Sequence, residues 1–226
     1  MTARRYAVLD CEDAPRWAGH DQNWIDLLRR PGEEWRSYRV WAGELPAAPS
    51  AHDGYVLTGS RHSVNDPAHS WLPPLFEFVA AAAAAEESRV FGACFGLQVI
   101  ATALGGRVAP NPSGRFAFGS ERVRFEGGEA LTLLESHGEQ AIALPAGARR
   151  LASSPTAENE MFAVGDHVLA VQFHAEFTPA MMLEKIYPRL REERRLDPDE
   201  EARALASLEQ PLDSARFLAE IRRFLG

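Results

Sequence analysis

Cysteine is scarce in this sequence, and long hydrophobic runs are missing. The only two cysteines among 226 residues are Cys11 and Cys94, too few for a disulfide framework, so we expect a reducing, cytoplasmic location. No apolar run approaches the roughly 18–20 residues that a membrane-spanning helix requires. The N-terminal segment Met1–Asp10 has no apolar stretch long enough for a secretory signal peptide. Disulfide-rich, membrane-spanning and secreted proteins are therefore not expected.

Basic residues are outnumbered by acidic ones. Lys and Arg total 24 against 32 Asp and Glu, which gives a formal net charge of −8. This balance disfavours binding to a phosphate backbone, so no nucleic-acid partner is expected. Hydrophobic residues make up 46% and charged residues 25% of the chain, as in ordinary globular domains. The length suits one compact domain.

Short apolar runs alternate with helical patterns in the first half of the chain. The expected strands are 6–9, 35–40, 54–57 and 89–93, and the expected helices are 23–28, 71–85 and 97–104. Strands and helices that alternate at this spacing predict a parallel sheet covered by helices on both faces.

The second half of the chain has a different pattern. Segments 107–125 and 150–173 contain short alternating runs separated by Gly, Pro and Asn, which predict antiparallel strands added to the sheet. A hairpin is expected between 161–164 and 168–173. The remainder, 179–226, is helical in pattern, with a break at Asp197-Pro198.

The sequence Gly92-Ala-Cys-Phe-Gly96 follows an apolar strand and precedes a helix. A nucleophile elbow needs this order, because the nucleophile lies on a strained turn where larger neighbours than glycine would clash. The helix N-terminus favours a thiolate at Cys94, and the backbone N–H of Phe95 would face a developing oxyanion. The alternative is a buried structural cysteine beside two packing glycines.

A second motif, Phe173-His-Ala-Glu176, ends a predicted strand. Residues two apart in a strand project from the same face, so His174 and Glu176 can both approach one nucleophile, as a base and its orienting carboxylate. The alternative is a histidine and a glutamate that are solvated or hydrogen-bonded locally. This pair has no third ligand nearby, so we expect no metal there.

Together these motifs resemble the class I glutamine amidotransferases. The resemblance rests on G-x-C-x-G-x-Q at 92–98, F-H-x-E at 173–176, the loop at 53–60 and S-H-G-E at 136–139. Segments 152–155 and 159–164 are similar to the amidotransferase domain of GMP synthetase, and 32–46 is similar to stand-alone members that hydrolyse γ-glutamyl peptides. One departure is Ala175, where the family usually has proline.

The resemblance implies a flavodoxin-like α/β fold. This is a three-layer sandwich with a mostly parallel central sheet, added antiparallel strands and a C-terminal helical extension. The family domain would span residues 1–190, and the extension, 191–226, would pack on the same domain.

The resemblance also implies a set of site residues. Cys94 would be the nucleophile, His174 the base and Glu176 its orienting acid, while the backbone amides of Gly59 and Phe95 would form the oxyanion hole. The residues expected to contact substrate are Ser60, Gln98, Ser136, His137, Gly138 and Glu139. No metal and no cofactor are expected.

The leading hypothesis is a hydrolase that cleaves the γ-amide of glutamine or of a γ-glutamyl compound through a thioester on Cys94. A separate acceptor or synthetase subunit and a homodimer both stay open. One alternative is a catalytically quiet amidotransferase-like subunit that binds a partner or a metabolite. Another is an esterase with a Cys-His-Asp triad, which the H-x-E spacing disfavours.

Overall fold

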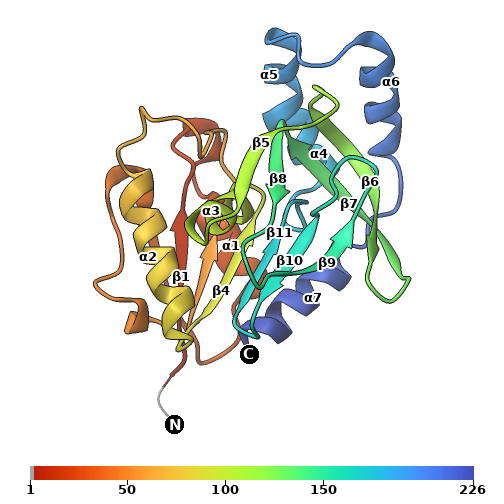
Figure 1. Ribbon diagram of the computed structural model, residues 1–226. Helices are drawn as coiled ribbons and strands as arrows, with labels where there is room; N and C mark the ends of the chain where they lie inside the picture. Colours follow the sequence, from red (N-terminus) through yellow and green to blue (C-terminus); the bar gives the residue numbers. More distant parts are fainter. Residues whose placement is uncertain (1–2) are drawn as a thin grey trace.

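A nine-stranded sheet forms the centre of the computed structural model, which describes residues 3–226 (Figure 1). The strand order is β2-β1-β3-β4-β11-β10-β9-β6-β7. The strands of this sheet are β1 Arg5–Asp10, β2 Glu34–Arg39, β3 Gly54–Leu57, β4 Arg89–Ala93, β6 Ala117–Phe125, β7 Ala130–His137, β9 Arg149–Ser153, β10 Met161–Val164 and β11 Val168–Val171.

The first five strands in this order, β2 to β11, are parallel. Helices cover both faces of this part, and their bounds are α1 His20–Leu28, α2 Leu72–Ala85, α3 Phe95–Ala103 and α7 Ser214–Leu225. One core packs α2 and α3 against Leu9, Leu57 and Ala170. The other packs α1 and α7 against Val8, Val56 and their neighbours. Successive strand residues thus alternate between two buried faces, as a central parallel sheet requires.

The remaining strands run antiparallel and curl back toward the parallel half. β10 pairs with β11 and β9, and β6 pairs with β9 and β7. Beyond β11 the chain meets β7 again, where the N–H of His174 donates to the carbonyl of Leu134 at 2.8 Å. A separate two-stranded sheet joins β5 Arg107–Pro110 to β8 Glu139–Ala143. This curl brings the strand edge of β7 to the end of β11.

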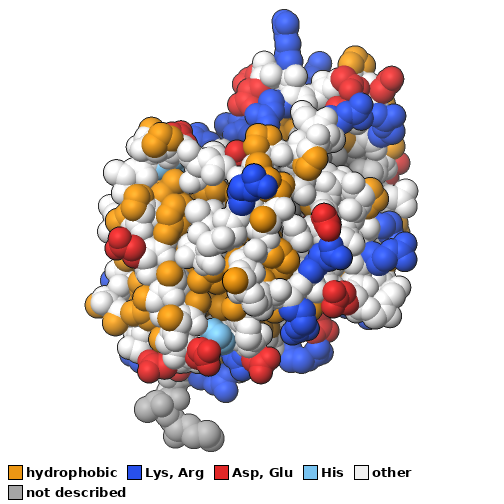
Figure 2. All heavy atoms as spheres, in the orientation of Figure 1, with side chains coloured by type: hydrophobic (Ala, Val, Ile, Leu, Met, Phe, Trp, Pro, Cys, Tyr) orange, Lys and Arg blue, Asp and Glu red, His pale blue; other side chains and the backbone are white. Residues whose placement is uncertain are grey.

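The C-terminal segments are helical and pack on two parts of the molecule. They comprise α4 Pro179–Met181, a π-helical turn at Met182–Ile186, α5 Tyr187–Glu192, α6 Pro198–Ser207 and α7. A third apolar cluster joins α5 and α6 to Phe118 of β6 and Leu134 of β7. Three short 3₁₀ turns complete the elements, at Pro15–Trp17, Val40–Ala42 and Pro49–Ala51. Figure 2 shows charged side chains gathered over α5 and α6 and few over α2.

The predicted three-layer α/β fold is confirmed, including the change from parallel to antiparallel pairing. The hairpin of β10 and β11 is also confirmed, although β11 ends at Val171 rather than Phe173. The separate sheet of β5 and β8 was not anticipated. Within residues 3–226 the structure has no helix with the length and apolarity needed to cross a bilayer.

Candidate active site

Cys94 lies at the turn between β4 and α3, in the conformation that a nucleophile elbow requires. Its φ is 52° and its ψ is −105°, which is strained for a non-glycine residue. A Cβ at Gly92 would lie 2.6 Å from the carbonyl of Gly96, and a Cβ at Gly96 would lie 2.5 Å from the carbonyl oxygen of Leu57. Both glycines are therefore needed for the turn to pack against the neighbouring strand.

His174 and Glu176 form a buried hydrogen-bonded pair. The Nδ1 of His174 lies 2.7 Å from the Oε1 of Glu176, and the two residues are only 2% and 4% exposed. The imidazole stacks on Phe177 with ring centroids 3.9 Å apart. Its backbone is held by the hydrogen bond to Leu134. Because Nδ1 donates to the carboxylate, Nε2 keeps the lone pair that a general base needs.

Cys94 and His174 border the same cavity, whose volume is about 380 Å³. Gly59 lies between them: a Cβ there would be 3.0 Å from Cε1 of His174 and 3.9 Å from Cβ of Cys94. The thiol of Cys94 donates to the carbonyl oxygen of Ser136 at 3.8 Å. The structure therefore brings together the three residues that the sequence predicted as a triad.

The charged form of His174, which arises when Nε2 takes a proton, is stabilised by its neighbours. Burial opposes charge on His174, but the Glu176 carboxylate and the Cys94 sulfur raise the pKa of the imidazole well above its usual value. Burial also opposes charge on Glu176, yet His174 and His20 together lower the pKa of this carboxyl to about 2. His20, on α1, lies 3.7 Å from the Oε1 of Glu176 and was missed by the sequence analysis, because no motif links these distant residues.

Two backbone amides are available for an oxyanion hole. Phe95 is the first residue of α3, so its N–H has no partner in the preceding turn. Gly59 follows β3 and borders the cavity beside Cys94. Their positions agree with the predicted role, which remains a prediction.

The predicted substrate residues all border this cavity, but some of their polar groups already contact other protein groups. Ser60, Ser136 and Gly138 line it directly. The amide nitrogen of Gln98 already donates to the carbonyl of Glu139 at 2.8 Å, which ties α3 to β8. The ring of His137 is 3% exposed and turns toward Glu135, whose Oε2 is 3.2 Å from its Nε2.

Comparison with known proteins identifies the family. The family model for "Glutamine amidotransferase class-I" matches residues 50–188, which contain all three triad positions. The chain belongs to the class I glutamine amidotransferase family. It is 31% identical to gamma-glutamyl peptidase 4 of Arabidopsis thaliana over 195 residues, covering 80% of this chain and 77% of that protein. It is 32% identical to the glutamine-hydrolysing GMP synthase of Vibrio cholerae over 135 residues, covering 56% of this chain and 24% of the synthase.

Solved structures of this family agree with the fold. The structure aligns with a glutamine amidotransferase from Thermotoga maritima with a TM-score of 0.78, 20% identity, and coverage of 100% of this chain and 97% of that one. A glutamine amidotransferase from Methylobacillus flagellatus aligns with the same TM-score and identity over 99% and 92% of the two chains. These likenesses show the fold of the family domain.

This amidotransferase-family protein also has a cationic rim that sequence reasoning missed. The cavity of Cys94 is bordered by basic side chains from the 3₁₀ turn at Pro15–Trp17, the loop after β3 and the C-terminal helical segments, and these are Arg16, Arg61, Lys185, Arg189 and Arg195. Arg61 is paired with Asp13 at 2.8 Å, and Arg189 and Arg195 lie 3.5 and 3.9 Å from Glu193. No carboxylate among residues 3–226 forms an ion pair with Arg16 or Lys185. Five basic side chains thus outnumber the two carboxylates, Glu12 and Glu139, that border the same cavity. The basic residues are far apart in sequence, so no local pattern predicted it.

Proposed function

We propose that this protein hydrolyses the γ-amide bond of a γ-glutamyl compound through a thioester on Cys94. The observation that carries the proposal is the strained elbow cysteine in one cavity with the buried pair of His174 and Glu176. A structural cysteine needs neither the strain nor the adjacent base, so this arrangement favours catalysis over a catalytically quiet subunit.

The proposed reaction has two halves. His174 takes the thiol proton, and the Cys94 sulfur attacks the γ-carbonyl carbon, whose oxygen becomes an oxyanion that the N–H groups of Gly59 and Phe95 stabilise. The C–N bond then breaks, and the imidazolium gives its proton to the leaving nitrogen. In the second half His174 takes a proton from water, the hydroxide attacks the thioester, and glutamate leaves as the thiol is restored. Glu176 holds the ring orientation throughout.

The cationic rim supports a leaving group that carries a carboxylate. Arg16 and Lys185 border the cavity and have no acidic partner within residues 3–226. A dipeptide such as γ-glutamylglycine has a carboxylate beyond the scissile bond, whereas glutamine has none. The relatives named gamma-glutamyl peptidases, with about three quarters of both chains aligned, agree with this choice. We therefore propose a γ-glutamyl peptidase.

Ammonia delivery to a separate synthetase is the second candidate. It rests on the likeness to GMP synthases, which reaches only 24% of the length of the Vibrio cholerae protein. In that case free glutamine would be the preferred substrate, and an acceptor subunit would be required for full activity.

The test uses three substrates that differ only beyond the scissile bond: glutamine, γ-glutamyl methylamide and γ-glutamylglycine. We expect a kcat/KM about tenfold higher for γ-glutamylglycine than for the methylamide, as one favourable ionic contact of about 1.4 kcal/mol provides. Mass spectrometry should detect a glutamyl adduct on Cys94, absent from Cys94→Ala. Turnover that survives in Cys94→Ala, or no adduct with any substrate, would refute the proposal, and a preference for glutamine would favour the second candidate.

A further inference from the structure

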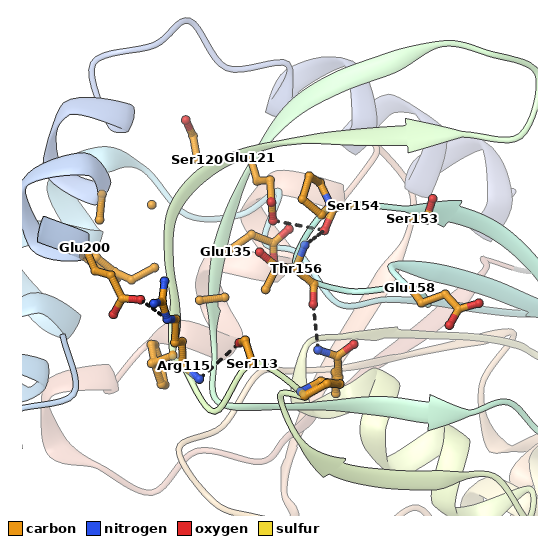
Figure 3. A pocket seen from close by; sticks show the side chains of 18 of the residues that line it. Ser113, Arg115, Ser120, Glu121, Glu135, Ser153, Ser154, Thr156, Glu158 and Glu200 are labelled. Atoms are coloured by element: carbon orange, nitrogen blue, oxygen red, sulfur yellow. Dashed lines mark hydrogen bonds and ion pairs between the residues drawn. The ribbon is translucent and has the colours of Figure 1, made fainter. Parts of the chain in front are cut away.

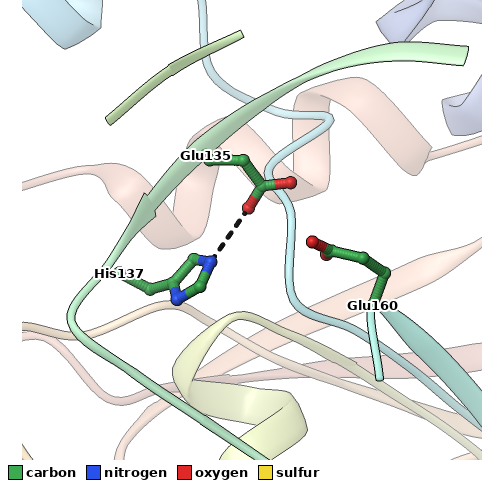
Figure 4. Close-up of side chains that lie close together, drawn as sticks. All are labelled: Glu135, His137 and Glu160. Atoms are coloured by element: carbon green, nitrogen blue, oxygen red, sulfur yellow. Dashed lines mark ion pairs between the residues drawn. The ribbon is translucent and has the colours of Figure 1, made fainter. Parts of the chain in front are cut away.

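Three buried side chains that the proposed reaction does not use lie together beside β7. Glu135 and His137 are on β7, and Glu160 directly precedes β10 (Figure 4). They are 2%, 3% and 0% exposed. One ligand atom of each lies within 4.8 Å of the ligand atoms of the other two. Two carboxylates and an imidazole therefore converge in the interior, almost fully buried.

Apart from the 3.2 Å contact between Oε2 of Glu135 and Nε2 of His137, the inward-facing atoms of this cluster have no polar partner among residues 3–226 (Figure 4). These atoms are both carboxylate oxygens of Glu135, Nε2 of His137 and Oε2 of Glu160. Buried polar atoms are nearly always satisfied, because leaving one unpaired costs about 1–3 kcal/mol. Several at one point indicate a group that completes the site.

The surroundings of His137 fix which ring nitrogen is free. Its Nδ1 faces two acceptors, the Oδ1 of Asn111 at 3.2 Å and the carbonyl of Glu139 at 3.1 Å. The Oδ1 of Asn111 also accepts from Gln140, which confirms its role as an acceptor. Nδ1 therefore carries the proton, and the lone pair of Nε2 points at Glu135. An outer partner on Nδ1 is the usual arrangement behind a metal-binding histidine.

Glu160 is oriented in a similar way. The hydroxyl of Ser154 donates to its Oε1 at 2.6 Å, which leaves Oε2 directed toward the cluster. Each of these two ligands thus has a neighbour that holds the side chain while its free atom faces inward.

A path connects the cluster to solvent. A cavity of about 900 Å³ lies between β6, β7 and α6, and Glu135 and Ser154 form part of its wall (Figure 3). The residues of the triad do not border this cavity, and Phe116 borders both this cavity and the one that holds Cys94. An ion can reach Glu135 without passing the catalytic thiol.

From this geometry we propose that Glu135, His137 and Glu160 bind a divalent transition-metal ion such as Zn²⁺. Imidazole and carboxylate together suit zinc and its neighbours, whereas Mg²⁺ and Ca²⁺ prefer oxygen alone. Two carboxylates balance the charge of a divalent ion, which removes the cost of burying them near one another. The cavity supplies water for the remaining coordination position.

The position of the site gives it a structural role. Ser136 lies between two of the ligands, and its carbonyl accepts from the Cys94 thiol. Leu134, next to Glu135, accepts from the backbone of His174. A bound ion would hold this part of β7 to β10 and so keep both contacts in place. The ion would be a positioning group, because its ligand Glu135 is next in sequence to both Leu134 and Ser136, which contact His174 and Cys94.

The competing explanation is a pair of neutral carboxyl groups with no ion. Burial raises the pKa of both Glu135 and Glu160 well above the usual value for glutamate. A protonated Glu135 could then donate to the Nε2 of His137. The two explanations differ in what zinc and isosteric substitution do to stability.

The experiment uses the full chain, stripped with a chelator, with Cys94→Ser in every sample so that zinc cannot bind the thiolate. Zinc binding is measured by titration calorimetry, and thermal unfolding is followed with and without Zn²⁺, Mn²⁺ and Co²⁺. The test variant is E135Q/E160Q, which keeps the shape of both side chains. The matched control is Glu158→Gln, which removes an exposed carboxylate from the wall of the same cavity.

We expect one equivalent of zinc per chain. At a free concentration about 100-fold above Kd, Tm should rise by about 5–10 °C for a chain of this size. Without metal, E135Q/E160Q should be at least as stable as its parent, and with zinc it should be less stable, so that the order inverts. Glu158→Gln should bind like its parent.

The proposal is overturned if none of the three ions binds stoichiometrically. It is equally overturned if E135Q/E160Q binds zinc as tightly as its parent, since the ion would then lie elsewhere. Native mass spectrometry of the wild-type chain after addition of one equivalent of zinc measures the same stoichiometry without depending on any variant. None of these readouts depends on turnover, so they stand apart from the test of the peptidase function.

Discussion

Replacing Glu176 by glutamine (E176Q) removes the charge that faces His174 and preserves the shape of the side chain. The carboxylate accepts from Nδ1 of His174 at 2.7 Å in a site without solvent. Glutamine can turn its amide NH₂ toward Nδ1, which would leave the proton on Nε2 and point the wrong nitrogen at the thiol.

The magnitude follows from the acidity of Glu176. Burial opposes the charged form, but His174 and His20 lower the pKa of this carboxyl from 4.5 to about 2. At 1.36 kcal/mol per pKa unit, this difference corresponds to about 3 kcal/mol. If the imidazolium loses that stabilisation in the transition state, kcat/KM should fall by about 10²-fold.

The assay is the rate of acylation of Cys94 by a γ-glutamyl substrate, measured in a single turnover by mass spectrometry. Circular dichroism of the same sample shows whether the variant is folded. The reasoning is refuted if folded E176Q acylates within threefold of the wild-type rate, because the carboxylate would then have no part in activating His174.

Three further predictions concern neighbouring groups. Gly59→Ala should lower turnover with little change in Tm, because its Cβ would lie 3.0 Å from the His174 ring. Gly96→Ala should lower Tm, because its Cβ would lie 2.5 Å from the carbonyl oxygen of Leu57. The reverse pattern would contradict the positions assigned to these two glycines. The stability that Glu176 contributes is present above its unfolded pKa of 4.5 and is lost as the pH falls toward 2. The free energies of unfolding of wild type and E176Q, measured with urea, should therefore converge as the pH falls through that interval. A difference that stays constant with pH would contradict this contribution of Glu176. R16A/K185A should lower the kcat/KM for γ-glutamylglycine toward the value for γ-glutamyl methylamide, and raised salt should have the same effect on the wild type. If the ratio of the two kcat/KM values does not change, the cationic rim does not recognise the substrate carboxylate.

Local patterns were sufficient for the parallel half of the fold and for the two motifs that place Cys94, His174 and Glu176 together. Cys94 is flanked by glycines that its turn requires, and His174 and Glu176 are two residues apart, so each motif contains the residues that determine its local geometry. The strand and helix periods in this half come from burial on two faces, which the apolar pattern records directly.

The remaining parts depend on contacts between distant residues. His20 meets Glu176 only after α1 packs on the sheet, and Glu160 meets Glu135 only after the antiparallel strands curl back. The pairing of β5 with β8 joins segments about thirty residues apart, without a turn motif between them. None of these contacts has a local sequence signal, so they emerge only with the tertiary structure.

The π-helical turn at Met182–Ile186 has a consequence for how the lining of the Cys94 cavity can change. Such a turn accommodates one residue more than a regular helix does, and Lys185 and Ile186 within it both border that cavity. Deleting one residue here would restore a regular α-helical turn and leave the helix that follows in its present orientation. Arg189 would then stay at the cleft, while the position of Lys185 would change. A single codon lost in this segment can therefore change the basic groups on one side of this cavity while the turn after β4 that carries Cys94 stays unchanged.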